Sequence, residues 1–211
     1  MKYKFITIEG NIGAGKTTLA TLLAQKFNAR LILEEFADNP FLPKFYEKPD
    51  QYAFALELFF MAERYKQLKE LLNNNDLFNT ITITDYLFTK CLLFAKTTLQ
   101  TEEYNLYAKL FDIINPHILQ PEILIYLHSP VQKLQENIKK RNRSYEQDIS
   151  NDYLFNLQTM YINYIKQHNL KALIFDCSNA DFINNPNHLN IITAALNRDY
   201  DNTTHYFTFP D

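Results

Sequence analysis

Glycine is almost absent from this chain. Only three occur in 211 residues, at Gly10, Gly13 and Gly15. Glycine loses more conformational entropy on folding than other residues, and it is useful where the backbone needs a positive φ angle or must approach a ligand closely. The cluster therefore indicates a loop of special backbone shape near the N-terminus.

The chain also has few cysteines, a small net charge and no long apolar run. Cys91 and Cys177 lie far apart and form neither a disulfide framework nor a metal-ligand pair, so a reducing cytoplasm is the expected compartment. A net charge of −3 argues against broad binding to nucleic-acid polymers. No apolar run reaches the ~20 residues of a membrane span, and the N-terminal segment indicates a strand rather than a signal peptide. We expect no nucleic-acid or membrane partner.

The three glycines lie between a predicted strand and a predicted helix. The apolar stretch YKFITIE precedes them, and KTTLATLLAQKF, with apolar residues at helical spacing, follows them. The loop between has the pattern Gly10-x-x-x-x-Gly15-Lys16-Thr17, which is typical of phosphate-binding loops in this context. In such loops, backbone N–H groups surround phosphates at a helix N-terminus, whose dipole favours anions.

This motif predicts a bound nucleoside triphosphate, ATP or a relative. Lys16 would reach the β- and γ-phosphates, and the Thr17 hydroxyl would hold Mg²⁺. The residues expected to contact the nucleotide are Gly10, Asn11, Ile12, Gly13, Ala14, Gly15, Lys16, Thr17 and Thr18.

Apolar strand candidates alternate with helices along the whole chain. They are KFITIE, RLILEE, TITIT, EILIYL and ALIFDC. This alternation predicts an α/β fold, with a five-stranded parallel sheet covered by helices on both faces. Nothing in the sequence reads as a linker, so a single domain over residues 1–211 is expected. The polar tail after Leu196 is expected to be mobile or docked on the surface.

Acidic residues follow two of the predicted strands, where ligands bind in open α/β sheets. Glu34 and Glu35 end the second strand, and a carboxylate there could accept a proton from a substrate hydroxyl. A helix-capping or solvated pair is an equally good interpretation. Asp85 follows the third strand and could complete a Mg²⁺ shell, cap the next helix, or do both.

Other charged residues are less specific by themselves. Glu57 and Arg64 share one face of a predicted helix over 51–73, and alone both would be taken as solvated. The run KKRNR, from Lys139 to Arg143, crowds a predicted turn. Its arginines could stabilise charge on a transferring phosphoryl group from a lid at about 139–150, and the alternative is a surface basic patch.

Together these segments resemble the deoxynucleoside kinase family over nearly the whole chain. EGNIGAGKTTLA resembles its phosphate loop, NPFLPKFYEKPDQYAFALELFFMAERYKQL its nucleoside pocket, and RNRSYEQDIS its arginine-rich lid. The resemblance implies a P-loop kinase fold, ATP and Mg²⁺, and phosphorylation of a deoxynucleoside 5′-hydroxyl. It also implies a homodimer, for which YLFTKCLLFA or LYAKLFDII could supply an apolar face.

The resemblance implies roles for the matched positions. Glu34 matches the general base, with Glu35 as the alternative, because Glu34-Glu35 stands where the family usually has Glu-Pro. The expected catalytic residues are Glu34, Lys16, Arg141 and Arg143. The expected substrate contacts are Glu34, Tyr46, Glu57, Arg64, Asp85 and Glu146, with Tyr46 and Glu146 at the sugar 3′-hydroxyl. Thr17 and Asp85 are the expected metal ligands.

Two positions depart from the family pattern. Tyr86 follows Asp85 where many members have an arginine, which leaves Arg64 or a lid arginine to steady the base. Glu57 stands where many members have a glutamine, and an ionised glutamate only accepts hydrogen bonds. It would suit the N1–H and 2-amino group of guanine or the adenine 6-amino group, whereas a protonated Glu57 would suit adenine N1. We therefore expect purine deoxynucleosides.

Two other functions stay open at this point. A nucleoside monophosphate kinase, such as thymidylate kinase, would need extra cations for the acceptor phosphate where this chain has Glu34. A non-catalytic nucleotide-binding module is the alternative of a different class. The Asn-Lys-x-Asp motif of guanine-specific switches is not in the sequence.

Overall fold

The computed structural model describes residues 1–34, 39–73 and 81–210, which form two compact units. Unit 1 comprises Met1–Leu33, Asp76–Tyr86 and Pro121–Asp211, and unit 2 comprises Glu34–Asn75 and Leu87–Gln120. Among the described residues, none of the helices combines the length and the apolar character that crossing a bilayer requires.

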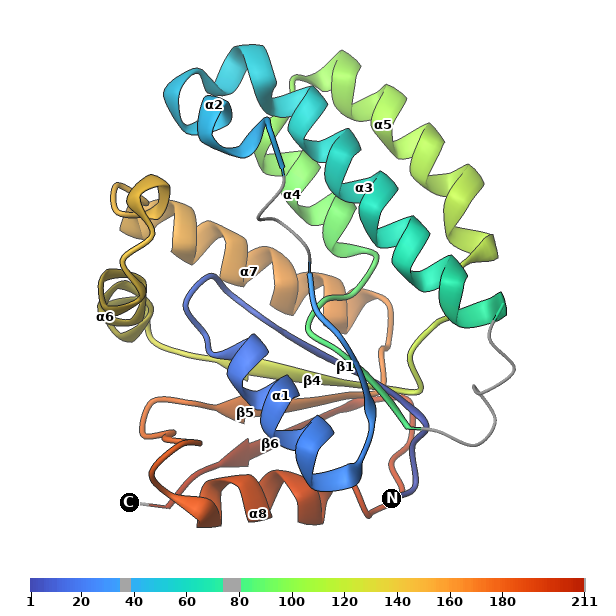
Figure 1. The fold of residues 1–211 in the computed structure, drawn as a ribbon, viewed down its shortest axis with the longest axis vertical. Coiled ribbons are helices and arrows are strands. Elements are labelled where there is room, and N and C mark those ends of the chain that lie inside the picture. Colours follow the sequence, from blue (N-terminus) through green and yellow to red (C-terminus); the bar gives the residue numbers. More distant parts are fainter. Residues whose placement is uncertain (35–38, 74–80, 211) are drawn as a thin grey trace. The chain divides into compact units, whose positions relative to one another are not determined.

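Unit 1 contains a parallel sheet, which confirms the predicted α/β class (Figure 1). Its strand order is β2-β3-β1-β4-β5-β6. The strands are β1 (Phe5–Gly10), β2 (Arg30–Ile32), β3 (Thr82–Thr84), β4 (Ile123–His128), β5 (Ala172–Asp176) and β6 (Thr204–Thr208). All six residues of β1 are buried, as expected of a central strand covered on both faces.

Within the residues that the structure describes, the sheet has six strands, one more than predicted. The tail after Leu196, expected to be mobile or docked, instead adds β6 beside β5 in parallel. Two aromatic contacts anchor it: Phe207 stacks on Phe175 with ring centroids 4.8 Å apart, and Phe209 stacks on the same ring at 5.7 Å. The tail was not predicted as a strand because it is mostly polar, although Phe207 and Phe209 alternate in it.

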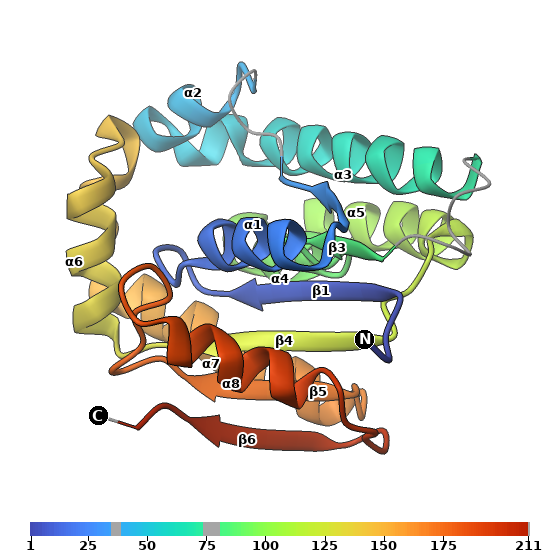
Figure 2. The same cartoon turned by 60° about the horizontal axis from the view of Figure 1, so that its bottom comes forward.

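Helices cover both faces of the sheet in unit 1 (Figure 2). Helices α1 (Lys16–Phe27) and α8 (Pro186–Ala195) lie on one face, and α7 (Asn151–Gln167) lies on the other. Helix α6 (Val131–Arg141) stands at the end to which the strands point, and a short 3₁₀ turn, η3 (Ser144–Glu146), follows it. Leu19 and Leu23, four positions apart on α1, are fully buried in the core cluster.

Unit 2 is helical. It contains α2 (Leu42–Glu47), α3 (Pro49–Asn73), α4 (Lys90–Thr98), α5 (Thr101–Ile114) and a 3₁₀ turn, η2 (Asn115–His117). The long helix α3 packs against α2, α4 and α5. Helix α5 begins with a capping box between Gln100 and Glu103, which satisfies N–H groups of its first turn.

Candidate active site

The loop between β1 and α1 has the backbone shape that its glycines predict. Gly13 and Gly15 have φ angles of +80° and +87°, in the left-handed region that favours glycine. A Cβ atom on Gly13 would lie 2.7 Å from the Leu134 carbonyl oxygen, whereas one on Gly15 would meet only the Phe182 ring, at 3.9 Å. The tight approach of α6 therefore excludes a side chain at position 13.

The N-terminus of α1 has the character of an anion site. Gly15 is its N-cap residue, no side chain among the described residues caps it, and its first turn contains no acidic residue. Thr17 and Thr18 are exposed on that turn. A helix start of this kind offers N–H groups and a positive dipole end to a phosphate, so the described residues fit the predicted nucleotide.

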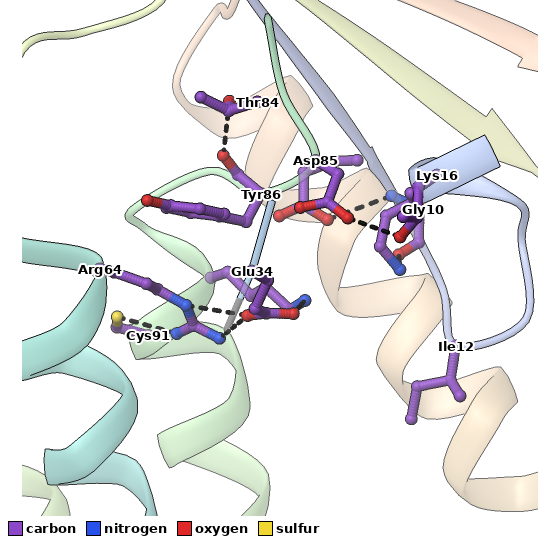
Figure 3. Close-up of polar contacts among 12 residues, drawn as sticks. Gly10, Ile12, Lys16, Glu34, Arg64, Thr84, Asp85, Tyr86 and Cys91 are labelled. Atoms are coloured by element: carbon purple, nitrogen blue, oxygen red, sulfur yellow. Dashed lines mark hydrogen bonds and ion pairs between the residues drawn. The ribbon is translucent and has the colours of Figure 1, made fainter. Parts of the chain in front are cut away.

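Side chains fix the loop from several directions. The Lys16 ammonium donates to the carbonyl oxygens of Gly10 and Asn11, both at 3.0 Å (Figure 3). The Asn11 amide donates to the Leu154 carbonyl at 2.7 Å, and the Asn137 amide donates to the Gly13 carbonyl at 2.8 Å. The loop is thus tied to both α6 and α7, which preorganises it.

Within the loop, Asn11 also accepts two backbone hydrogen bonds. Its side-chain oxygen accepts from the Ile12 N–H at 2.8 Å, and its carbonyl accepts from the Ala14 N–H at 3.1 Å. The nine residues predicted to contact the nucleotide form one segment, which runs from the last residue of β1 through the loop to the first turn of α1.

Thr17 and Asp85, the two expected metal ligands, are in direct contact. The Thr17 hydroxyl donates to Asp85 Oδ2 at 2.6 Å. Asp85 does not cap the following helix, because α4 begins at Lys90 with Thr89 as its N-cap residue. No group of three or more His, Cys, Asp or Glu residues converges in the described part of the chain. A hydroxyl and a carboxylate suit Mg²⁺, which is usually held by one or two protein oxygens together with water and phosphate.

The predicted lid residues cluster after α6. Arg141 Nη2 donates to Glu146, and Arg143 Nη1 donates to the other carboxylate oxygen of Glu146 at 3.2 Å. Glu146 is buried, whereas the two arginine side chains are 37% and 29% exposed. The structure therefore brings these three predicted residues together, with the guanidinium groups at the surface of unit 1.

In unit 2, Glu34 is held between two cations. Its Oε1 accepts from both Nε and Nη2 of Arg64, the Nε contact being 2.9 Å (Figure 3). Its Oε2 accepts from the Lys90 ammonium at 2.8 Å. Burial by itself would raise the pKa of Glu34, but the charges and hydrogen bonds of Lys90 and Arg64 outweigh it and hold the pKa well below its usual range. Glu34 is an ionised carboxylate at neutral pH.

Arg64 is itself fully enclosed. It is 3% exposed, its Nη1 donates to the Cys91 sulfur at 3.0 Å, and its guanidinium lies 5.0 Å from the centroid of the Phe60 ring. Sequence reasoning placed Arg64 near the base but did not single out Lys90. The available signal was a lysine inside the apolar run FTKCLLFA, on the buried face of a helix.

Glu57 is buried in the same unit. Its Oε1 accepts from the Thr98 hydroxyl at 2.9 Å, and its backbone carbonyl accepts from the Tyr107 hydroxyl at 3.2 Å. Burial raises the pKa of Glu57 to about 7, against the opposing charge of Arg64 and the hydrogen bond from Thr98. Glu57 can therefore be either a hydrogen-bond donor or a pure acceptor near neutral pH.

Two further predicted positions complete the set. Tyr46 lies on α2, 36% exposed, with its ring edge-on to Phe45 at 5.4 Å. Glu35, the alternative general base, lies outside the described residues.

The chain was compared with family models, with curated proteins and with solved structures. The family model described as deoxynucleoside kinase matches residues 6–199. A deoxyguanosine kinase from Bacillus subtilis (strain 168) is 37% identical over 197 residues, which cover 91% of this chain and 95% of that protein. A deoxyadenosine/deoxycytidine kinase from the same organism is 31% identical over 211 residues, or 95% of each chain. A solved structure of deoxyadenosine kinase from M. mycoides with bound dATP aligns with a TM-score of 0.78 at 25% identity, covering 92% of this chain and 99% of that one.

Proposed function

The chain belongs to the deoxynucleoside kinase family, and from that premise we propose that it transfers the γ-phosphate of ATP to the 5′-hydroxyl of a purine deoxynucleoside. The observation that carries the proposal is the Glu34 carboxylate, held ionised and oriented by Arg64 and Lys90. A fixed carboxylate is the group that can accept the proton of an attacking alcohol. We propose that both units act together as one kinase domain over residues 1–211.

The nucleotide is proposed to bind on the glycine loop of unit 1. The N–H groups at the start of α1 and the Lys16 ammonium would hold its phosphates. Mg²⁺, when bound by Thr17 and Asp85, would neutralise charge on those phosphates. Because Asn11 and Asn137 already tie the loop to α7 and α6, little ordering is left to be done on binding.

The low pKa of Glu34 is compatible with its role. Phosphoryl transfer passes through a loose transition state, so catalysis depends on positioning and charge stabilisation more than on a strong base. Glu34 would orient the hydroxyl and accept its proton as the new P–O bond forms. The two cations prevent the carboxylate from rotating away from that geometry.

The lid residues are proposed to close on the reacting groups. Arg141 and Arg143 would donate to phosphate oxygens, and each guanidinium has five N–H donors, so it can keep Glu146 as a partner at the same time. Glu146 and Tyr46 would share the sugar 3′-hydroxyl. Closure would exclude water and so limit hydrolysis of ATP.

Glu57 is proposed to read the purine. Ionised, it would accept from the N1–H and 2-amino groups of guanine; protonated, it would donate to adenine N1 and accept from the 6-amino group. Its pKa of about 7 makes both forms available, so both purine deoxynucleosides are expected substrates.

A coupled assay of ADP release tests the proposal. The panel is four deoxynucleosides, their ribose counterparts and their monophosphates, with ATP and Mg²⁺. Turnover with a purine deoxynucleoside, and a 5′-monophosphate product identified by mass spectrometry, supports it. Turnover confined to monophosphates would assign a monophosphate kinase instead, and ATP binding without turnover would assign a binding module.

We also propose a cytoplasmic homodimer that uses the apolar face of α4 or α5. Leu106 and Ile113 on α5 are 52% and 67% exposed and lie seven positions apart, so they share one face of the helix. Light scattering coupled to size exclusion measures the mass in solution. A monomer at every concentration tested would contradict the dimer.

A further inference from the structure

Lys90 is an unusual lysine for its place in the fold. It is 5% exposed, and lysine is almost never so buried unless it is paired. It is also the first residue of α4, where the helix dipole disfavours a positive charge. Two local rules are thus broken at one residue, which is typical of functional positions.

The contact that compensates for this placement is with Glu34. The Lys90 ammonium lies 2.8 Å from Glu34 Oε2, while Arg64 takes Oε1 with two N–H groups. Each carboxylate oxygen therefore has its own cation, from a different helix. Arg64 holds the carboxylate at one oxygen, and Lys90 adds a second point of attachment at the other.

Lys90 is itself fixed in place. Its backbone N–H donates to the Leu87 carbonyl at 2.9 Å, and its ammonium lies 5.3 Å from the centroid of the Phe94 ring on the same helix. Among the described residues, the ionisable groups near Glu34 and the two cations include Glu57 on α3, Cys91 on α4 and Tyr107 on α5. Lys90 and Arg64 are the cations that lower the pKa of Glu34.

We infer that Lys90 is a positioning residue for catalysis, which fixes the orientation of the Glu34 carboxylate together with Arg64. The inference rests on the proposed role of Glu34 as proton acceptor. Tyr86 stands after Asp85, where many members of the family have an arginine, and Lys90, five residues after Asp85, provides a cation in its place. Lys90 acts through Glu34 and transfers no proton or phosphoryl group itself.

The test compares Lys90→Met with Lys96→Met, since Lys96 is an exposed lysine on the same helix. Lys90→Met keeps an unbranched side chain, one atom shorter than that of lysine, and removes its charge. We expect kcat to fall by about 10- to 100-fold with an unchanged KM for ATP, because the base loses its orientation. Lys96→Met is expected to match the wild type, and Lys90→Arg to recover most of the loss.

The pH profile separates positioning from a merely structural role. It is measured as kcat in the Glu57→Gln background, because Glu57 titrates near neutrality. Losing one cation should move the acid limb assigned to Glu34 upward by about one to three pH units in Lys90→Met. An acid limb and a kcat equal to those of the background enzyme would overturn the inference.

A double-mutant cycle with Glu34→Gln covers the case in which Lys90→Met folds poorly. If Lys90 acts through Glu34, adding Lys90→Met to Glu34→Gln should cost no further kcat. A further loss of the full size seen in the single variant would overturn the inference. Wild-type kcat in Glu34→Gln would instead overturn the role that the proposed function gives to Glu34 as the base, so the two failures are distinguishable.

Discussion

The phosphate loop of unit 1 and the Glu34 cluster of unit 2 differ in the groups that are available to stabilise a negative charge. The loop uses backbone groups, shaped by Gly13 and Gly15 at positive φ and fixed by two asparagine amides. The cluster uses side chains only, with Glu34 between Arg64 and Lys90. The loop is therefore sensitive to any side chain that is added, and the cluster to any charge that is removed.

The largest expected effect is on the side-chain site. Glu34→Gln keeps the shape of the residue and removes its ability to take a proton. We expect kcat to fall by about 10²- to 10⁴-fold, the usual size of general base catalysis, while the affinity for an ATP analogue stays unchanged. Steady-state kinetics and calorimetric titration measure the two quantities, and a kcat within tenfold of the wild type would show that the carboxylate is not the base.

The next effect tests the backbone site. Gly13→Ala puts a methyl group 2.7 Å from the Leu134 carbonyl oxygen and also strains φ, whereas Gly15→Ala strains φ but makes only an ordinary contact, at 3.9 Å, with the Phe182 ring. Urea denaturation should show a loss of about 1–2 kcal/mol in the free energy of unfolding for Gly15→Ala. Gly13→Ala should lose more, about 3 kcal/mol, because backbone must also move.

Equal losses in the two glycine variants would mean that the contact with α6 does not shape the loop. Retained binding of ATP by Gly13→Ala would have the same meaning. Either result would leave the Glu34 cluster unaffected, since that cluster is made within unit 2.

A smaller effect concerns base selectivity. As pH rises through about 7, Glu57 loses its proton and becomes a pure acceptor, so the ratio of kcat/KM for deoxyguanosine to that for deoxyadenosine should rise by about tenfold. The ratio cancels pH effects that both substrates share. Glu57→Gln should make the ratio independent of pH; a ratio that changes equally in the variant would remove Glu57 from base reading.

The smallest effect concerns the outer support of the loop. Asn137→Ala removes the hydrogen bond from α6 to the Gly13 carbonyl and should cost about 1 kcal/mol in the free energy of unfolding. A matched control is Asn190→Ala, since the Asn190 side chain accepts an exposed hydrogen bond from Lys26 at 2.8 Å. If both variants lose the same amount, the tether from α6 adds nothing to the loop.

The same contrast explains which features could be predicted from the sequence. The phosphate loop is local: its glycines, Lys16 and Thr17 lie within eight positions, between a strand and a helix with clear patterns. The parallel sheet was predictable for the same reason. Asp85 was placed correctly at a strand end, because parallel strands bring such residues to one edge.

The Glu34 cluster could be predicted only in part. Its place at a strand end made Glu34 a candidate base, and the family resemblance gave roles to Glu34 and Arg64. Lys90 is distant from both in sequence and lies in a run typical of an ordinary apolar helix. Its ammonium reaches Glu34 because of how α4 packs on α3, which no local pattern encodes. The pKa of Glu57 is likewise a property of burial among neighbouring helices.

The match to the family model ends at residue 199, but the folded sheet does not. Strand β6 begins five positions later, and Phe207 on this strand and Phe209 just after it stack on the Phe175 ring. Removing the last eight residues would uncover an aromatic side chain in the interior and open a hydrogen-bonded sheet edge to solvent. A chain truncated where the family match ends would therefore lack a strand of the folded sheet.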